Sequence, residues 1–144
     1  MTVNQILSVK GNDVHSIVST ITVYDALKVM GEKNIGAVLV IEDNLLKGVL
    51  SERDYARKIV LKNKASKDTL VHEIMEQNII TVKPTDNLDY CMELMSIKRI
   101  RHLPVVDGNA VLGVISIGDV VKSIIEIQKE TIQHLDSYIS GTKA

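Results

Sequence analysis

Two short stretches of sequence decide the fold: GVLSERD at residues 48–54 and GVISIGD at residues 113–119. They begin 65 positions apart (113 − 48), and the sequence shifted on itself by 65 residues keeps one ungapped register from Val14/Ile79 to Val60/Ile125. Chance would not keep so long a register free of gaps. The chain therefore consists of two copies of one unit.

Each copy is predicted to fold as β-α-β-β-α. A short strand comes first, and the helix after it carries apolar residues at i, i+3, i+4 and i+7, from Val23 to Met30 and again from Leu88 to Met95. The strands are expected at 16–18, 37–41 and 48–51 in the first copy and at 81–83, 103–106 and 113–116 in the second. The predicted class is α/β (α+β), with two repeats related by pseudo-two-fold symmetry.

Four segments are expected along the chain. The first repeat with its N-terminal lead-in covers 1–62, a polar linker 63–69, the second repeat 70–126 and a C-terminal helical extension 127–144. The lead-in at 6–10 matches 71–75, with Val9 opposite Ile74, so it is expected to pack within its own repeat. In the last helix an apolar stripe from Val121 to Ile139 advances in steps of four and three, which a partner helix could cover, and Gly141 is a plausible stop.

Composition excludes several classes of protein. The chain has 144 residues and a net charge of −1, which does not suit a general nucleic-acid coat. Eighteen Ile and eighteen Val build an aliphatic core, and the absence of Phe and Trp argues against a platform for stacking bases. The single Cys91 suits a reducing compartment. We expect neither a signal peptide nor a membrane span, and a soluble, cytoplasmic protein.

The S-x-x-D spacing within both decisive stretches has two interpretations. It is typical of a capping box, in which Ser and Asp satisfy the first N–H groups of a helix. It also lies where a strand ends and a helix begins, three residues after Gly48 or Gly113. The N–H groups of a helix N-terminus can bind a phosphate, and an Asp carboxylate can accept both ribose hydroxyls. Capping residues can also face a ligand, so the two interpretations are compatible.

The unit resembles the CBS domain, and the whole chain resembles a tandem CBS pair, or Bateman module. The resemblance rests on GVLSERD and GVISIGD, on HEIMEQNIITVKPTDNL and on IRHLPVVDG, and it covers about Ile6 to about Ile125. It implies a stand-alone bacterial-type regulatory protein that senses an adenosine-containing ligand. AMP is the first choice, with ADP, ATP, NAD(H) or S-adenosylmethionine as alternatives. The resemblance also implies a flat, disk-like homodimer and an unknown downstream protein target.

The resemblance further implies two clefts, each of which takes Ser and Asp from one repeat and a lead-in from the other. Cleft A would contain Lys10, Asp13, Val14, His15, Arg101, His102, Ser116 and Asp119. Cleft B would contain Gly36, Ala37, Ser51, Arg53, Asp54, Ile79 and Ile80. Arg101 and His102 occupy the positions of Gly36 and Ala37 in the first repeat. We therefore expect a monophosphate in cleft A, and cleft B empty or holding a different ligand. The basic run 98–102 could also be a solvated helix end.

No spacing of residues typical of a catalytic or metal site is found, so we expect no enzyme activity and no metal. Cys91 lies on the predicted apolar face of a helix and is expected to be a core thiol. The alternative function is a protein–protein interaction module that acts through its dimer and C-terminal helix, with vestigial clefts. An enzyme of nucleotide turnover is a third hypothesis. Neither nucleic acid nor a membrane is an expected partner.

Overall fold

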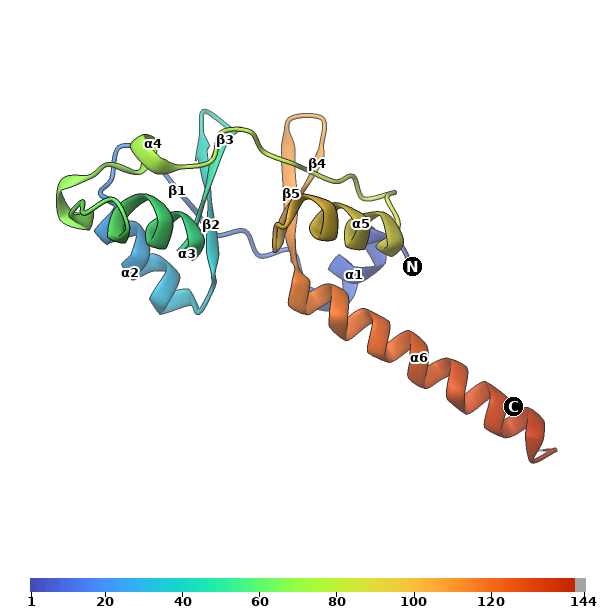
Figure 1. The fold of residues 1–144 in the computed structure, drawn as a ribbon. Helices are drawn as coiled ribbons and strands as arrows, with labels where there is room; N and C mark the ends of the chain where they lie inside the picture. The colour runs from blue at the N-terminus through green and yellow to red at the C-terminus, as the bar shows by residue number, and fades with distance from the viewer. Residues whose placement is uncertain (142–144) are drawn as a thin grey trace.

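The computed structural model describes residues 1–141 and contains two α/β units side by side, with a long helix leading away from the second (Figure 1). The first unit contains β1 (Ser16–Ile17), α2 (Val23–Lys33), β2 (Ala37–Glu42), β3 (Leu45–Ser51) and α3 (Glu52–Tyr55), which continues into a π-helical turn, Ala56–Val60. The second contains α5 (Leu88–Lys98), β4 (His102–Asp107), β5 (Ala110–Ser116) and α6 (Ile117–Ile139). The helices α1 (Val3–Lys10) and α4 (Val71–Ile74) precede the two units. The predicted α/β class and the two repeats are confirmed.

The two sheets differ by one strand. In the first unit β1 runs parallel to β2, which pairs antiparallel with β3. In the second unit β4 and β5 form the same hairpin, but the predicted strand 81–83 is reduced to one parallel bridge between Val82 and Val105. Pro104 explains the difference. It occupies the position of Leu39, whose N–H donates to the His15 carbonyl at 3.3 Å, and proline has no N–H for the equivalent bond.

The two units exchange their lead-in helices. Val3, Ile6 and Leu7 of α1 are at most 4% exposed and belong to the core of the second unit, whereas Val71 and Ile74 of α4 belong to the core of the first. The expectation that the N-terminal segment packs within its own repeat is therefore wrong. Burying such aliphatic side chains contributes roughly 1.5–3 kcal/mol each, so each unit depends on the other's helix for part of its core.

Backbone hydrogen bonds fix the register of this exchange. Val3 N donates to the Asp86 carbonyl at 2.8 Å, and Val71 N donates to the Ile21 carbonyl at 2.9 Å. The acceptors are 65 residues apart but the donors are 68 apart, so the predicted pairing of Val9 with Ile74 is wrong. The three additional residues lengthen α1, which has eight residues where α4 has four. The last turn of α1 ends at Lys10.

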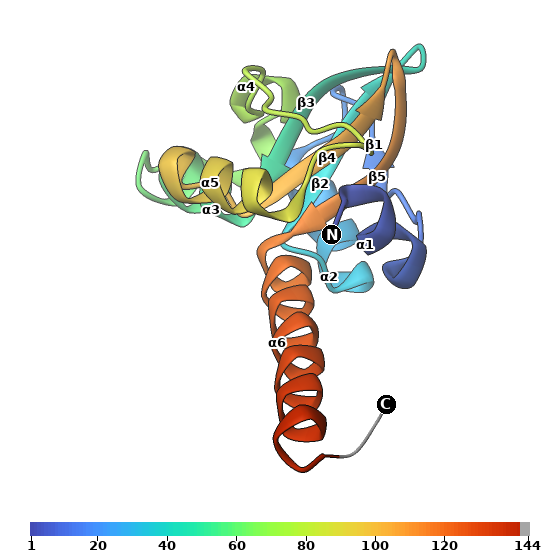
Figure 2. The same cartoon turned by 90° about the vertical axis from the view of Figure 1, so that its right-hand side faces the viewer.

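The last helix also differs between the repeats. In the second unit α6 is a continuous helix of 23 residues, as the apolar stripe predicted, and it extends well beyond the unit (Figure 2). It ends before Ser140, and Gly141 adopts a left-handed φ of 73°, which confirms the expected stop. Residues 142–144 of the predicted extension lie outside the described residues. Within residues 1–141 no helix combines the length and the apolar character needed to cross a membrane.

Part of the predicted linker is ordered. A 3-10 turn covers Ser66–Asp68, and Thr69 is only 5% exposed. The Thr69 hydroxyl donates to the Ala65 carbonyl at 2.9 Å, and the Thr69 carbonyl accepts a bond from Val23 N at 2.8 Å. The end of the linker is therefore held against α2, where α4 enters the first unit.

The contact between α1 and β5 gives a test of the exchange. A Cβ atom on residue 113 would lie 2.8 Å from Leu7 Cδ2, so Gly113→Ala is expected to lower the free energy of unfolding by about 1–2 kcal/mol. Leu7→Ala alone should cost about 2–4 kcal/mol. The double variant should cost less than the sum, because alanine at residue 7 makes room for the new methyl group. Urea denaturation measures all three values.

The matched control is Gly31→Ala in α2. A Cβ there would meet nothing within 4 Å, so this variant should be neutral or stabilised by up to about 1 kcal/mol. Strict additivity of Gly113→Ala and Leu7→Ala would contradict the packing of α1 on the second unit.

Candidate functional site

Two cavities lie between the units, and we call them cleft A and cleft B after the predicted sites. Cleft A has a volume of about 380 Å³ and cleft B of about 640 Å³. Both volumes fall in the range of small-molecule sites. Gly36, Ala37 and His102 line both clefts, so the clefts share a wall.

Cleft A takes its walls from both units, as predicted. Lys10, Asp13 and His15 line it from the N-terminal segment, and His102 and Ser116 line it from the second unit. Asp119 lies next to this wall, hydrogen-bonded to Lys10 and Ser116. Val14 does not line the cavity.

Arg101 lines cleft B, so its predicted place in cleft A is wrong. Arg101 lies just before β4, whereas His102, the first residue of β4, lines both clefts. The Arg101 carbonyl accepts a bond from Ile117 N at 2.8 Å, at the start of α6. The residues predicted for cleft B all line it: Gly36, Ala37, Ser51, Arg53, Asp54, Ile79 and Ile80.

Both S-x-x-D motifs form capping boxes at the start of a helix. Ser51 N donates to Asp54 Oδ2 at 2.9 Å, and Asp54 N donates to Ser51 Oγ at 3.1 Å. The equivalent distances for Ser116 and Asp119 are 2.8 and 3.2 Å. Ser51, Asp54 and Ser116 also line the clefts. The capping interpretation is confirmed, and it leaves these side chains next to the space for a ligand.

A lysine reaches each of the two aspartates, from a different element in each cleft. Lys10 Nζ lies 2.6 Å from Asp119 Oδ2 and also donates to the Val114 carbonyl. Lys58 Nζ lies 3.2 Å from Asp54 Oδ1 and donates to the Ile74 carbonyl at 2.8 Å. Lys10 ends the additional turn of α1, and Lys58 lies in the π-helical turn after α3. Both lysines therefore come from segments in which the two repeats differ.

The electrostatics of cleft A depend on Lys10. Burial alone would raise the pKa of Asp119, but the hydrogen bonds from Lys10 and Ser116 hold that pKa below its usual value. Burial, followed by the charges of Lys10 and Arg101, lowers the pKa of His102 below its usual value of 6.5. His102 is therefore a neutral imidazole at pH 7. It offers a hydrogen bond rather than a positive charge to both clefts.

Cleft B carries more positive charge than cleft A. Its lining includes five cationic side chains, Arg53, Arg57, Lys58, Lys98 and Arg101, and three carboxylates, Glu52, Asp54 and Glu76. The charged side chains that line cleft A are Lys10 and Asp13. The clefts are unequal, as expected, but the additional charge that the sequence assigned to cleft A lies in cleft B.

Several lining residues were missed from the sequence. The i, i+4 spacing of Asp54 and Lys58 is a signal that could have placed Lys58 beside the predicted aspartate. Lys98 and Glu76 carry no such signal, because only the packing of the two units brings them to cleft B. Cys91 is fully buried, and burial raises the pKa of its thiol, as expected of a core residue. Residues 1–141 contain no cluster of His, Cys, Asp and Glu suited to a metal ion.

The lowered pKa of Asp119 predicts a pH-dependent contribution to stability. The ionised carboxylate stabilises the fold at pH values above its unfolded pKa near 4, and this contribution is lost as the pH falls through the lower folded pKa. Asp119→Asn should therefore lower the free energy of unfolding by about 1 kcal/mol at pH 7, a modest amount because the ion pair with Lys10 is partly exposed. Its melting temperature should approach that of the parent protein as the pH falls below about 4.

Asp107→Asn, which removes an exposed carboxylate from the tip of a hairpin, is the matched control and should show little effect at any pH. A difference between Asp119→Asn and the parent that stays constant from neutral pH to pH 3 would contradict the ion pair with Lys10.

The chain matches the family model of the CBS domain twice, at residues 6–61 and 71–126. It is 43% identical over 125 residues to the CBS domain-containing protein CBSX3, mitochondrial, of Arabidopsis thaliana. That match covers 83% of this chain and 61% of the relative. The chain thus spans about three-fifths of the length of this relative.

Solved structures agree with the sequence matches. A protein with CBS domains from Burkholderia ambifaria is 47% identical, with a TM-score of 0.84 and coverage of 88% of this chain and 95% of that one. The CBS domain pair of protein MJ0100, in complex with 5′-methylthioadenosine and S-adenosyl-L-methionine, is 25% identical, with a TM-score of 0.76 and coverage of 86% and 95%. Two matches to the CBS model and the paired units of the structure show that this chain belongs to the CBS-domain family.

Proposed function

We propose that this chain is a regulatory module that binds adenosine-containing nucleotides in clefts A and B. One observation carries the proposal: each S-x-x-D motif lies at a strand-to-helix junction beside a cavity built from both units. A ligand in such a cavity contacts both units at once. The CBS pair of protein MJ0100, solved with two adenosine-containing molecules, supports this class of ligand.

In cleft A the ligand would meet three kinds of group. The N-terminus of α6, a helix of 23 residues, offers its positive dipole end to a phosphate, although Ile117 N and Asp119 N already donate to the Arg101 carbonyl and to Ser116 Oγ, and Lys10 adds a full charge. Asp119 can accept hydrogen bonds from the ribose hydroxyls while Lys10 turns toward the phosphate. Ile35, Leu39 and Val114 form an aliphatic wall for the adenine ring. Lys10 therefore has a role in both the empty and the occupied cleft.

The different charges of the clefts suggest different ligands. Cleft A, with one lysine on its wall, suits a single phosphate, and we propose AMP there. Cleft B is larger and has five cationic side chains, including Arg101, whose planar guanidinium can bind two phosphate oxygens. We propose that cleft B binds a ligand with more phosphate, such as ATP, ADP or NAD(H).

We propose that two features allow regulation: the wall that clefts A and B share, and the assembly of two chains into a homodimer. His102 lines both clefts, so a ligand in one changes the surroundings of the other. We propose that the nucleotide favours one arrangement of a homodimer that is recognised by a downstream protein. The nucleotide can change the arrangement of the homodimer only if it binds one arrangement more tightly than the other. The cytoplasmic location stays a prediction, since the Arabidopsis relative is named as mitochondrial.

A second candidate function is supported by the exposed apolar stripe of α6. The chain would then be a protein–protein interaction module, with clefts that bind no ligand. Binding of a target protein that is indifferent to nucleotides and to both aspartates would favour this alternative. Neither function requires enzyme activity, and we propose none.

The nucleotide proposal predicts a pattern of thermal shifts. AMP, ADP, ATP, NADH and S-adenosylmethionine are each added to purified protein that is verified to be free of nucleotide. A bound ligand should stabilise the fold by roughly 2.7 kcal/mol at 100 times its Kd. Asp119→Ala should reduce the shift caused by AMP more than Asp54→Ala does. Arg101→Gln should reduce the shift caused by ATP more than that caused by AMP.

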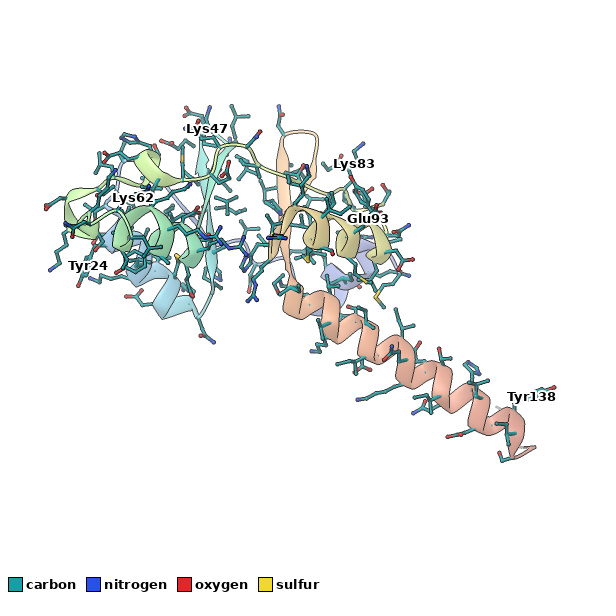
Figure 3. All side chains as sticks on the ribbon, in the orientation of Figure 1. Tyr24, Lys47, Lys62, Lys83, Glu93 and Tyr138 are labelled. Carbon is teal, nitrogen blue, oxygen red and sulfur yellow. The ribbon has the colours of Figure 1, made fainter. Side chains whose placement is uncertain are left out.

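The control for charge is Lys62→Gln, which removes an exposed cation after the π-helical turn, away from both clefts (Figure 3). It should leave every ligand-induced shift unchanged. No shift with any of these ligands at millimolar concentration would reject the proposed function, and equal losses in Asp119→Ala and Asp54→Ala would reject the assignment of AMP to cleft A.

A further inference from the structure

Lys10 occupies the side of Asp119 at which a ribose would bind. Its Nζ lies 2.6 Å from Asp119 Oδ2 and also donates to the Val114 carbonyl, which belongs to the wall of cleft A. Ser116 N donates to the same oxygen at 2.8 Å, as part of the capping box. A carboxylate oxygen has two lone-pair positions, so these two donors already use both positions of Oδ2. A ribose diol can therefore bind Asp119 through both carboxylate oxygens only when Lys10 moves away.

The end of α1 fixes the point from which Lys10 reaches Asp119. Gly11 follows Lys10 with a φ of 100°, a value that favours glycine, and its N–H donates to the Leu7 carbonyl at 2.7 Å. Leu7 is buried in the core of the second unit, which also contains Asp119. The backbone of Lys10 is therefore held against the unit of its partner, and its side chain is the part that is free to exchange one anion for another.

Separating Lys10 from Asp119 has an electrostatic cost. Burial would raise the pKa of Asp119, but the hydrogen bond from Lys10 is the first of the interactions that hold this pKa below its usual value. The carboxylate is thus ionised at pH 7. A ligand that displaces Lys10 without offering another anion leaves the carboxylate without its counter-charge. Because the pair is partly exposed, this cost corresponds to a loss of affinity of a few-fold.

A phosphate on the 5′ carbon of the ligand offsets this cost. The displaced ammonium group of Lys10 can donate a charge-assisted hydrogen bond to the phosphate, while the ribose hydroxyls take its position on Asp119. Adenosine has the same hydroxyls but no anion to receive Lys10. A cationic group at the 5′ carbon, such as the sulfonium of S-adenosylmethionine, is repelled by Lys10 as well. The three kinds of ligand therefore differ at the one atom that Lys10 must approach.

We propose that Lys10 makes cleft A selective for adenosine derivatives with a 5′-phosphate, because its ion pair with Asp119 excludes ligands that cannot replace the counter-charge. This inference rests on the proposed function and deepens it. Lys10 does not only bind the phosphate of the accepted ligand. It also lowers the affinity of cleft A for ligands that lack one.

Titrations of AMP and adenosine into Lys10→Met test the proposal. This variant keeps the aliphatic stem and removes the charge. Ser116 lines cleft A and not cleft B, so the chemical shift of its backbone amide reports the Kd of cleft A. The Kd of AMP should rise roughly tenfold, and the Kd of adenosine should fall roughly threefold. A general loss of structure would weaken both ligands, so opposite changes separate the proposed role from a structural one.

Three further variants serve as controls. Lys10→Arg keeps the charge and should still bind AMP more tightly than adenosine. Lys62→Met makes the same substitution away from both clefts and should change neither Kd. Asp119→Asn should bind adenosine with the same Kd whether or not Lys10→Met is added, because the gain in affinity comes from the carboxylate that Lys10 releases.

The outcomes separate this inference from the proposed function. If the parent protein binds AMP in cleft A but Lys10→Met weakens both ligands, or leaves the Kd of adenosine unchanged, the inference is overturned and the proposed function stands. A parent protein that binds adenosine as tightly as AMP would also overturn the inference. A Ser116 amide that does not respond to AMP would reject the proposed binding of AMP in cleft A, and the inference with it.

Discussion

Val3, Ile6 and Leu7 of α1 pack into the core of the second unit, while Val71 and Ile74 of α4 pack into the core of the first. The other features of the molecule depend on this exchange. Neither repeat completes its core alone, so separating the units exposes aliphatic surface from both. The exchange therefore holds the N-termini of α3 and α6 at a fixed distance from the lead-in segment of the other repeat. The clefts form where these segments meet.

A difference of three residues between the lead-ins has large consequences for cleft A. The lead-ins are related by 68 residues whereas the units are related by 65, so α1 has an additional turn that ends at Lys10. Without that turn, no lysine of α1 would reach Asp119. Cleft B obtains its lysine from the π-helical turn after α3, and Arg101 turns toward cleft B as well. Small departures from the repeat thus give two similar cavities different charges.

The repeat, the α/β class and the long last helix could be predicted, because they follow from spacing and hydrophobic pattern along the chain. Most of the residues that line the clefts were instead implied by the resemblance to a CBS pair. The resemblance implied that each cleft takes a lead-in from the other repeat, but the packing of α1 and α4 in the other unit's core could not be predicted, since an apolar helix carries no information about which of two similar cores receives it. The location of Arg101 in cleft B also escaped prediction, because the resemblance placed it with His102 in cleft A. Pro104 is a local signal that could have predicted the shortened strand at Val82.

The central claim is that one ligand contacts both units. Titration of isotope-labelled protein with AMP, followed through backbone amide chemical shifts, tests it most directly. The account predicts that the amides at the start of α6, from Ser116 to Asp119, and those from Lys10 to His15 shift together with a single Kd. Shifts confined to one unit, or confined to the outer turns of α6, would contradict it.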